Sequence, residues 1–107
     1  MDINPKKSLG QNFLQDKNIL NLIVDKSKIS QDDTVIEIGP GTGNLTKMIV
    51  KKKPKKLIIF EKDKKLYDKL NHMFKDNIDI RNGDFLLYDD HNLKYDNLIV
   101  LGNLPYN

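Results

Sequence analysis

The feature that most constrains the fold is a β-branched run that ends in a glycine-rich turn. Residues 34–38 read Thr-Val-Ile-Glu-Ile, which is typical of a strand, and residues 39–43 read Gly-Pro-Gly-Thr-Gly, which is typical of a turn. Leu45, Met48 and Ile49 then recur at helical spacing. A strand that turns through glycines into a helix begins a strand–helix–strand unit, which favours an α/β fold with a parallel sheet.

The rest of the chain repeats this alternation. The apolar run at residues 57–60 predicts a strand that ends at Glu61, and Asp63 is placed to cap the helix that follows. Further strands are expected at residues 78–80 and 98–101, a helix from Asp16, and a loop or weak helix over residues 86–96. The continuous apolar runs at 57–60 and 98–101 indicate strands buried on both faces of the sheet.

The strand at residues 98–101 bears on the domain organisation. It is apolar enough for the interior of a sheet, yet only six residues follow it. An open apolar edge is an aggregation liability. We therefore expect the 107 residues to be the N-terminal part of a longer protein.

Charge is distributed unevenly along the chain. Residues 1–75 carry 16 basic and 9 acidic side chains, whereas residues 76–107 carry 2 basic and 6 acidic ones. A phosphate-facing surface would explain the basic part, but so would a general preference for lysine, since Arg81 is the one arginine. Cysteine is absent, which excludes disulfides and thiolate chemistry. Without a signal-like or membrane-length apolar run, an intracellular soluble protein is expected.

The glycine turn and Glu61 form a candidate ligand site. Glycines such as Gly39 and Gly41 let the backbone approach a ligand closely, and ligands of doubly wound sheets bind at the carboxyl ends of the strands. Glu61 lies 20 residues beyond Gly41, where an acidic residue accepts hydrogen bonds from ribose hydroxyls. The spacing misses the dinucleotide fingerprint, because Gly43 is followed by Asn44.

Two further segments suit an aromatic ring that carries an amine. Asp84 can accept from the exocyclic amine of an adenine with Phe85 beside the ring, although Asn-Gly-Asp is also an ordinary turn. Residues 103–106, Asn-Leu-Pro-Tyr, combine an amide oxygen, a fixed backbone and a flat aromatic face. Residues 10–14, Gly-Gln-Asn-Phe-Leu, either fold over a ligand or lead into the first helix. His72 and His91 have no partner at metal-ligand spacing, so no metal is expected.

Together these motifs resemble the ribosomal RNA adenine dimethyltransferases. The resemblance spans residues 6–107 and rests on five ordered motifs: Lys7–Leu14, Val35–Thr46, Glu61, Asp84 and Gly102–Asn107. It implies a Rossmann-like class I methyltransferase fold, here its first four strands, with S-adenosyl-L-methionine as cofactor. The implied acceptor is N6 of adenosines in small-subunit ribosomal RNA, since the motif wording is closer to those enzymes than to the macrolide-resistance methylases of large-subunit RNA.

The resemblance also implies roles for individual residues. Cofactor binding falls to Asn12, Leu14, Gly39, Gly41, Glu61, Asp84, Phe85 and Asn103. Catalysis falls to Asn103, Pro105 and Tyr106: the Asn103 side-chain oxygen and the carbonyl of Leu104 or Pro105 would accept from N6, and Tyr106 would stack on the base.

The chain departs from the family in length. Family members are more than twice as long, so residues 1–107 would be the N-terminal part of the catalytic domain, without its later strands and without the helical RNA-binding domain. We expect this part alone to be inactive or at best a weak cofactor binder, and the full-length protein to be a monomer in the cytoplasm, or in an organelle. The alternatives are a non-catalytic nucleic-acid-binding relative, such as the mitochondrial transcription factors, and a nicotinamide dehydrogenase, which Asn44 and the Asn-Leu-Pro-Tyr loop disfavour.

Overall fold

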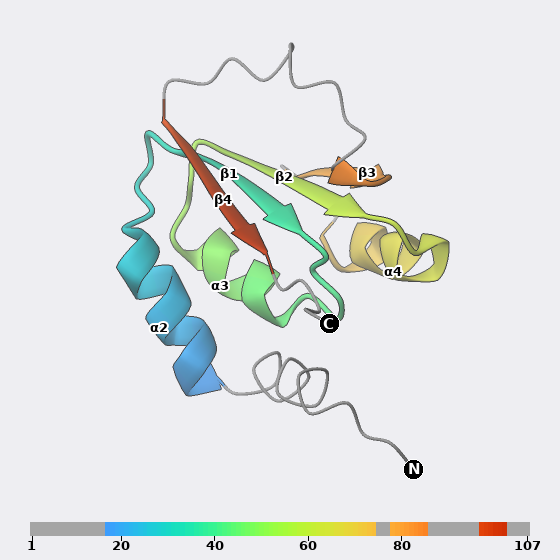
Figure 1. Cartoon of the computed structure of the whole chain (residues 1–107), viewed down its shortest axis with the longest axis horizontal. Coiled ribbons are helices and arrows are strands. Elements are labelled where there is room, and N and C mark those ends of the chain that lie inside the picture. Colours follow the sequence, from blue (N-terminus) through green and yellow to red (C-terminus); the bar gives the residue numbers. More distant parts are fainter. Residues whose placement is uncertain (1–16, 75–77, 86–96, 103–107) are drawn as a thin grey trace.

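The fold is a parallel four-stranded sheet with helices, as the sequence predicts. The computed structural model describes residues 17–74, 78–85 and 97–102. In chain order the elements are α2 (Lys17–Ser27), β1 (Thr34–Ile38), α3 (Asn44–Lys51), β2 (Lys56–Glu61), α4 (Lys64–Met73), β3 (Ile78–Asn82) and β4 (Leu98–Gly102). The strand order across the sheet is β3-β2-β1-β4 (Figure 1).

The register of the sheet aligns the carboxyl ends of its strands. Ile38, which ends β1, pairs with Phe60 of β2 on one side and with Gly102 of β4 on the other. Glu61, which ends β2, pairs with Asn82 of β3. All the pairs are parallel, so the four strands end at one edge of the sheet, the carboxyl edge.

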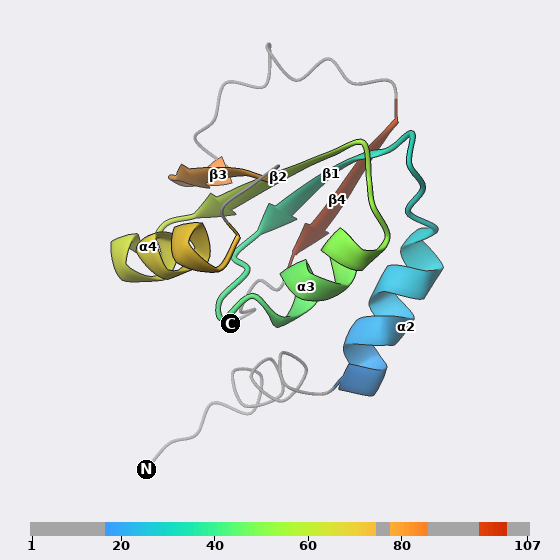
Figure 2. The ribbon, with the colours of Figure 1, turned by 180° about the vertical axis from the view of Figure 1, so that it is seen from behind.

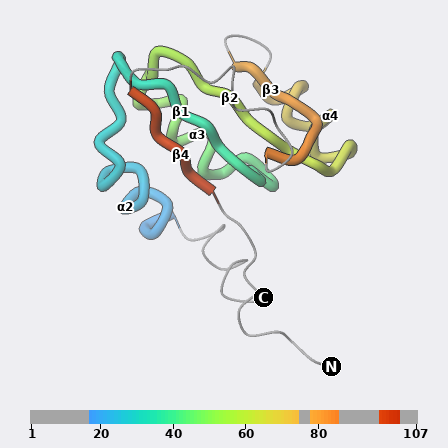
Figure 3. Tube along the Cα trace, turned by 45° about the horizontal axis from the view of Figure 1, so that its top comes forward, coloured from blue at the N-terminus to red at the C-terminus, as the bar shows by residue number. Residues whose placement is uncertain are grey.

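The described helices lie on one face of the sheet (Figures 1 and 2). Apolar positions of α2 and α3 recur at helical spacing and pack on the strand residues that point to this face. The resulting core is 3% exposed or less at every position: Leu20, Val24, Val35, Leu45, Ile49, Leu57 and Ile59. On α4, which lies beside β2 and β3, Leu70 is buried to 1% exposure. In Figure 3 the strands β1 and β2 pass in front of α3, which belongs to this helical layer.

The opposite face of the sheet carries a second, smaller apolar cluster. Ile36, Ile58 and Phe60 are buried there, and Ile38 and Phe85 pack against them. Among the described residues, no helix covers this face (Figures 1 and 2). The two clusters together explain why every residue of the run 57–60 is apolar: the side chains alternate between two buried faces.

The apolar run 98–101, which has the pattern of a strand buried on both faces, forms the open apolar edge that is also expected for it, and only one of its faces is buried in the described structure. Ile99 and Leu101 pack against the helical core, but Leu98 and Val100, which point the other way, are 41% and 46% exposed. The reason is position, because β4 is an edge strand of the described sheet. An apolar run cannot distinguish an edge strand from a central one.

The local predictions otherwise agree with the structure. Asp63 is the N-cap of α4, and its carboxylate accepts from the backbone N–H groups of Lys65 and Leu66 at 2.8 and 3.2 Å. The predicted helix start at Asp16 and the segment 86–96 lie outside the described residues. Within the described ranges, none of the helices is both long and apolar enough to cross a membrane.

Candidate functional site

Backbone hydrogen bonds hold the segments beyond β1, β2 and β3 together at the carboxyl edge. The N–H of Gly39 donates to the carbonyl of Phe60 at 3.0 Å, which ties the glycine turn to β2. The carbonyl of Glu61 accepts from the N–H of Gly83 at 3.0 Å and from the side-chain amide of Asn82 at 2.9 Å. The structure therefore brings together the predicted site residues Gly39, Gly41, Glu61 and Asp84.

The glycine turn adopts a conformation that side chains disfavour. Gly39, Gly41 and Gly43 have φ angles of 65°, 59° and 89°, in the left-handed region. Gly43 is also the N-cap of α3, and a Cβ on it would fit tightly, 3.3 Å from the Phe74 ring and 3.4 Å from Leu70 and Met73. The turn is thus a compact backbone surface, with α3 starting directly behind it.

Glu61 is held in a fixed orientation. It is 7% exposed, and its Oε2 accepts from the backbone N–H of Asp63 at 2.9 Å. Since Asp63 is itself fixed as the cap of α4, the turn between β2 and α4 positions the Glu61 carboxylate. A carboxylate placed in this way is a suitable acceptor for vicinal hydroxyl groups.

Asp84 and Phe85 follow β3 in different environments. The Asp84 carboxylate is 28% exposed and lies 3.9 Å from the Lys62 ammonium. Phe85 packs edge-on against Phe60, with ring centroids 5.2 Å apart, in the second apolar cluster. The Arg81 guanidinium lies over the Phe60 ring, 5.5 Å from its centroid. Asp84 is therefore accessible to a ligand, whereas contact of Phe85 with an adenine ring stays a prediction.

Glu37 is a buried carboxylate near the glycine turn, and the sequence motifs give it no role of its own. It lies in β1 at 1% exposure, with Oε1 accepting from the Thr46 hydroxyl at 2.5 Å. Its Oε2 is buried, and no partner for it exists among the described residues. Burial raises the pKa of Glu37 to about 7, against the lowering effect of the Thr46 hydrogen bond and with a smaller raising contribution from Glu61. The sequence feature that could have indicated this buried carboxyl group is a single glutamate inside an otherwise uncharged strand.

The other predicted site residues fall outside the described part of the chain. These are Asn12, Leu14, Asn103, Leu104, Pro105 and Tyr106. The described chain reaches the carboxyl edge at Gly102, opposite Ile38 of β1. The residue roles given above for these positions stay predictions.

The described residues suit a neutral or cationic nucleoside better than a phosphate. Glu61 and Asp84 offer carboxylate oxygens for hydroxyl and amine donors. The buried Oε2 of Glu37, in the strand that leads into the glycine turn, has no hydrogen-bond partner in the described part of the chain. Within the described ranges, no cluster of three or more metal-ligating side chains occurs. The acceptor set at the edge therefore fits the ribose and adenine of a nucleoside cofactor.

Comparison with known proteins adds independent information. The family model described as "Ribosomal RNA adenine dimethylase" matches residues 3–107. The chain is 49% identical over 107 residues to "Ribosomal RNA small subunit methyltransferase A" of Pelagibacter ubique, covering all of this chain and 40% of that protein. It is 47% identical over 105 residues to the protein of the same name from Hydrogenobaculum, covering 98% of this chain and 40% of that one.

A solved structure agrees with these sequence matches. The crystal structure of a dimethyladenosine transferase from Plasmodium falciparum superposes with a TM-score of 0.69 at 30% identity, over 85% of this chain and 33% of the other. This match confirms the methyltransferase type of α/β fold. The chain spans about 40% of the length of the curated relatives it matches.

Proposed function

The chain belongs to the ribosomal RNA adenine dimethylase family, and from this premise we propose that it forms the cofactor-binding half of an enzyme that methylates adenosines in ribosomal RNA. The cofactor is S-adenosyl-L-methionine, which supplies a methyl group on a sulfonium centre. The acceptor is N6 of adenosines in small-subunit RNA, in keeping with the names of the relatives.

One observation carries the proposal: the glycine turn, Glu61 and Asp84 come from three neighbouring strands and meet at one edge of the sheet. Glu61, already oriented by the Asp63 N–H, holds the ribose hydroxyls. Asp84 accepts from the adenine amine. The turn at Gly39 and Gly41 carries no side chains, so the methionine part of the cofactor passes close to the backbone.

The acceptor side of the site falls to residues 103–106. The Asn103 side-chain oxygen and a carbonyl of Leu104 or Pro105 accept from the two N6 hydrogens, which turns the nitrogen lone pair toward the methyl group. Tyr106 stacks on the target base, which must leave its own stack to reach the site. Positioning of the two reactants supplies most of the rate enhancement, and no strong base is needed because N6 becomes acidic once methylated.

The proposed substrate suggests where the reaction takes place: in the cytoplasm, or in an organelle with its own ribosomes, on RNA of the immature small subunit. We propose further that the full-length protein acts as a monomer and has no membrane partner.

Calorimetric titration with S-adenosylmethionine tests the cofactor half directly. We expect weak but saturable binding by the 107-residue chain, and at least about tenfold weaker binding by Glu61→Gln, which keeps an acceptor for the Asp63 N–H but loses the charge. Asp68→Asn, an equal charge change on exposed α4, is the matched control. Equal affinities of all three proteins would contradict the assignment of Glu61, and tight binding of a reduced nicotinamide cofactor instead would contradict the proposed function.

A further inference from the structure

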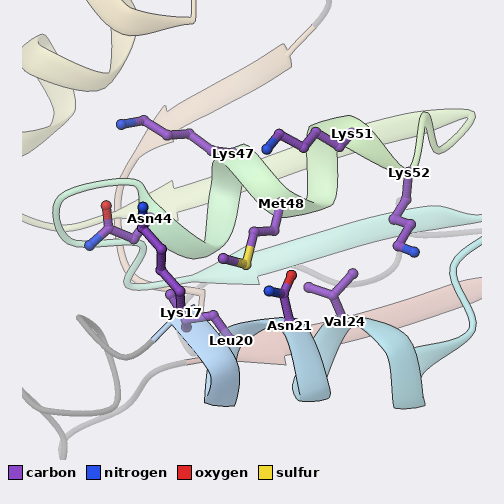
Figure 4. Close-up of a pocket in the computed structure, with 9 residues that line it drawn as sticks. All are labelled: Lys17, Leu20, Asn21, Val24, Asn44, Lys47, Met48, Lys51 and Lys52. Atoms are coloured by element: carbon purple, nitrogen blue, oxygen red, sulfur yellow. The ribbon is translucent and has the colours of Figure 1, made fainter.

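A basic groove runs between α2 and α3, away from the residues assigned to the cofactor. It has a volume of about 480 Å³ and is bordered by Lys17, Lys47, Lys51 and Lys52. Figure 4 shows Lys17 at one end, Lys52 at the other, and Met48 reaching from α3 toward α2. Together with Leu20 and Val24 of α2, Met48 gives the groove an apolar floor.

Within the described ranges, acidic side chains do not balance the charge of this groove. None of the described residues that line it is acidic, and the sequence of α3 contains no acidic residue. Of the four lysines, Lys52 forms an ion pair with Asp25 at 3.3 Å, and the structure shows no ion pair for the other three within its described part. On α4, by contrast, Lys64 is paired with Asp68 at 2.9 Å. The groove therefore concentrates positive charge beyond the general abundance of lysine.

The arrangement of these charges fits a linear polyanion. Lys47 and Lys51 are one helical turn apart, about 6 Å along the axis of α3, and Lys17 stands on the other side of the groove, at the start of α2 near Asn44 (Figure 4). Lysines of this kind lay their methylene stems on apolar surface and hold their ammonium groups in water. Such a row binds repeated phosphates rather than a single buried ion.

The position of the groove indicates which polyanion. Asn44, which lines the end of the groove near Lys17, directly follows Gly43 of the glycine turn. The groove thus opens at the carboxyl edge of the sheet, beside the candidate site. We propose that the α2–α3 groove binds the phosphodiester backbone of single-stranded RNA and leads it to that edge. This inference rests on the proposed function, because the substrate RNA is the polyanion that must reach the site.

Fluorescence anisotropy with a labelled oligouridylate of about 12 nucleotides tests the groove, using the 107-residue chain between about 50 and 200 mM salt. Contact with about three phosphates predicts that log K falls with log salt at a slope of about −2. The double variant Lys47→Glu, Lys51→Glu should bind at least about tenfold more weakly, with a slope reduced by more than half. The neutral variant Lys47→Ala, Lys51→Ala, which favours the helix, should give an intermediate loss.

The control is Lys65→Glu, Lys69→Glu, an identical charge change on exposed positions of α4, which should change affinity by about twofold or less. The inference would be overturned if the control lost as much affinity as the groove variant, or if the groove variants bound RNA as well as the parent chain. It would also be overturned if poly-glutamate displaced the RNA, or if the parent chain did not bind RNA. Titration of the same samples with S-adenosylmethionine distinguishes failure of this inference from failure of the proposed function. The cofactor affinity tests the proposed function, and the groove variants should not change that affinity.

Discussion

Glu37 makes the stability of this chain depend on pH in a way that one substitution removes. Its carboxyl group is buried in β1, bonded to Thr46 through one oxygen and without a described partner on the other. The folded protein therefore keeps the proton that the unfolded chain releases near pH 4.5, up to a pH of about 7, the raised pKa of Glu37. Glu37→Gln replaces this group by a neutral amide of nearly the same shape, which can still accept from the Thr46 hydroxyl.

The sign and size of the effect follow from proton linkage. Below pH 4.5 both states hold the proton and Glu37 costs nothing through ionisation. As the pH rises from 4.5 to about 7, the folded state binds more protons than the unfolded one, so the free energy of unfolding decreases. At about 1.4 kcal/mol per pH unit, the total loss is about 3 kcal/mol, reached above pH 7. Glu37→Gln abolishes it and should be more stable than the parent by about this amount at pH 8.

Urea denaturation followed by circular dichroism at several pH values between 4.5 and 8 measures this difference. Other titrating groups are common to both proteins, so the quantity to plot is the difference in free energy of unfolding, variant minus parent. It should be close to zero at pH 4.5 and level off above pH 7. Parallel curves for the two proteins would refute the argument, because they would mean that Glu37 ionises alike in both states.

Thr46→Val provides an independent check on the same group. The Thr46 hydroxyl donates to Glu37 Oε1 and lowers the pKa of Glu37. Without this donor the charged form is less favourable, so Thr46→Val should destabilise the protein more at pH 8 than at pH 5. In the Glu37→Gln background this pH dependence of the Thr46→Val effect should vanish. Its persistence there would assign the effect to another group.

Three further predictions concern the turn, the α4 cap and the acceptor loop. Gly43→Ala places a Cβ at φ 89° against Leu70 and Phe74 and should lower the free energy of unfolding by about 1–3 kcal/mol. The control Gly83→Ala, with open space around its Cβ, should change that free energy by less than about 0.5 kcal/mol in the same urea denaturation experiments. Asp63→Ala removes the cap of α4 and should lower stability by about 1 kcal/mol; no loss would show that the cap is dispensable. The acceptor loop can be tested in a chimaera in which the remainder of the Pelagibacter ubique relative follows residue 107. There Asn103→Ala should slow methyl transfer to small-subunit RNA by about 100-fold or more, whereas the control Asn97→Ala, at the amino end of β4, should not slow it. Undiminished transfer by the Asn103→Ala variant would contradict the role of Asn103.

The predictability of the fold from the sequence is limited by what an apolar run encodes. Residues 57–60 and 98–101 have the same pattern, and both form parallel strands as predicted. The first run is buried on both faces, while the second exposes Leu98 and Val100. A run of apolar side chains indicates that a strand can be buried on both faces. Whether it is buried depends on which other strands and helices pack against it.

The candidate site is predictable to the extent that strand ends determine it. Glu61 and Asp84 are predictable as site residues because each lies at or just beyond the end of a predicted strand, Glu61 also at the expected distance from the glycine turn, and the carboxyl ends of parallel strands share one edge. Their different surroundings were not predictable: the orientation of Glu61 by the Asp63 N–H depends on the geometry of one turn, and the packing of Phe85 on Phe60 depends on the face to which β2 directs that ring. The sequence positions of these residues do not show that their side chains make these contacts.

Glu37 shows most clearly what the sequence could have indicated. A carboxylate between Ile36 and Ile38 must either face solvent or be buried at a cost, and in a central strand covered on one side by α3 the second outcome follows. An apolar side chain there would avoid the cost of about 3 kcal/mol at neutral pH derived above. A buried carboxyl group with a strongly raised pKa beside a glycine turn therefore marks Glu37 as a candidate functional residue.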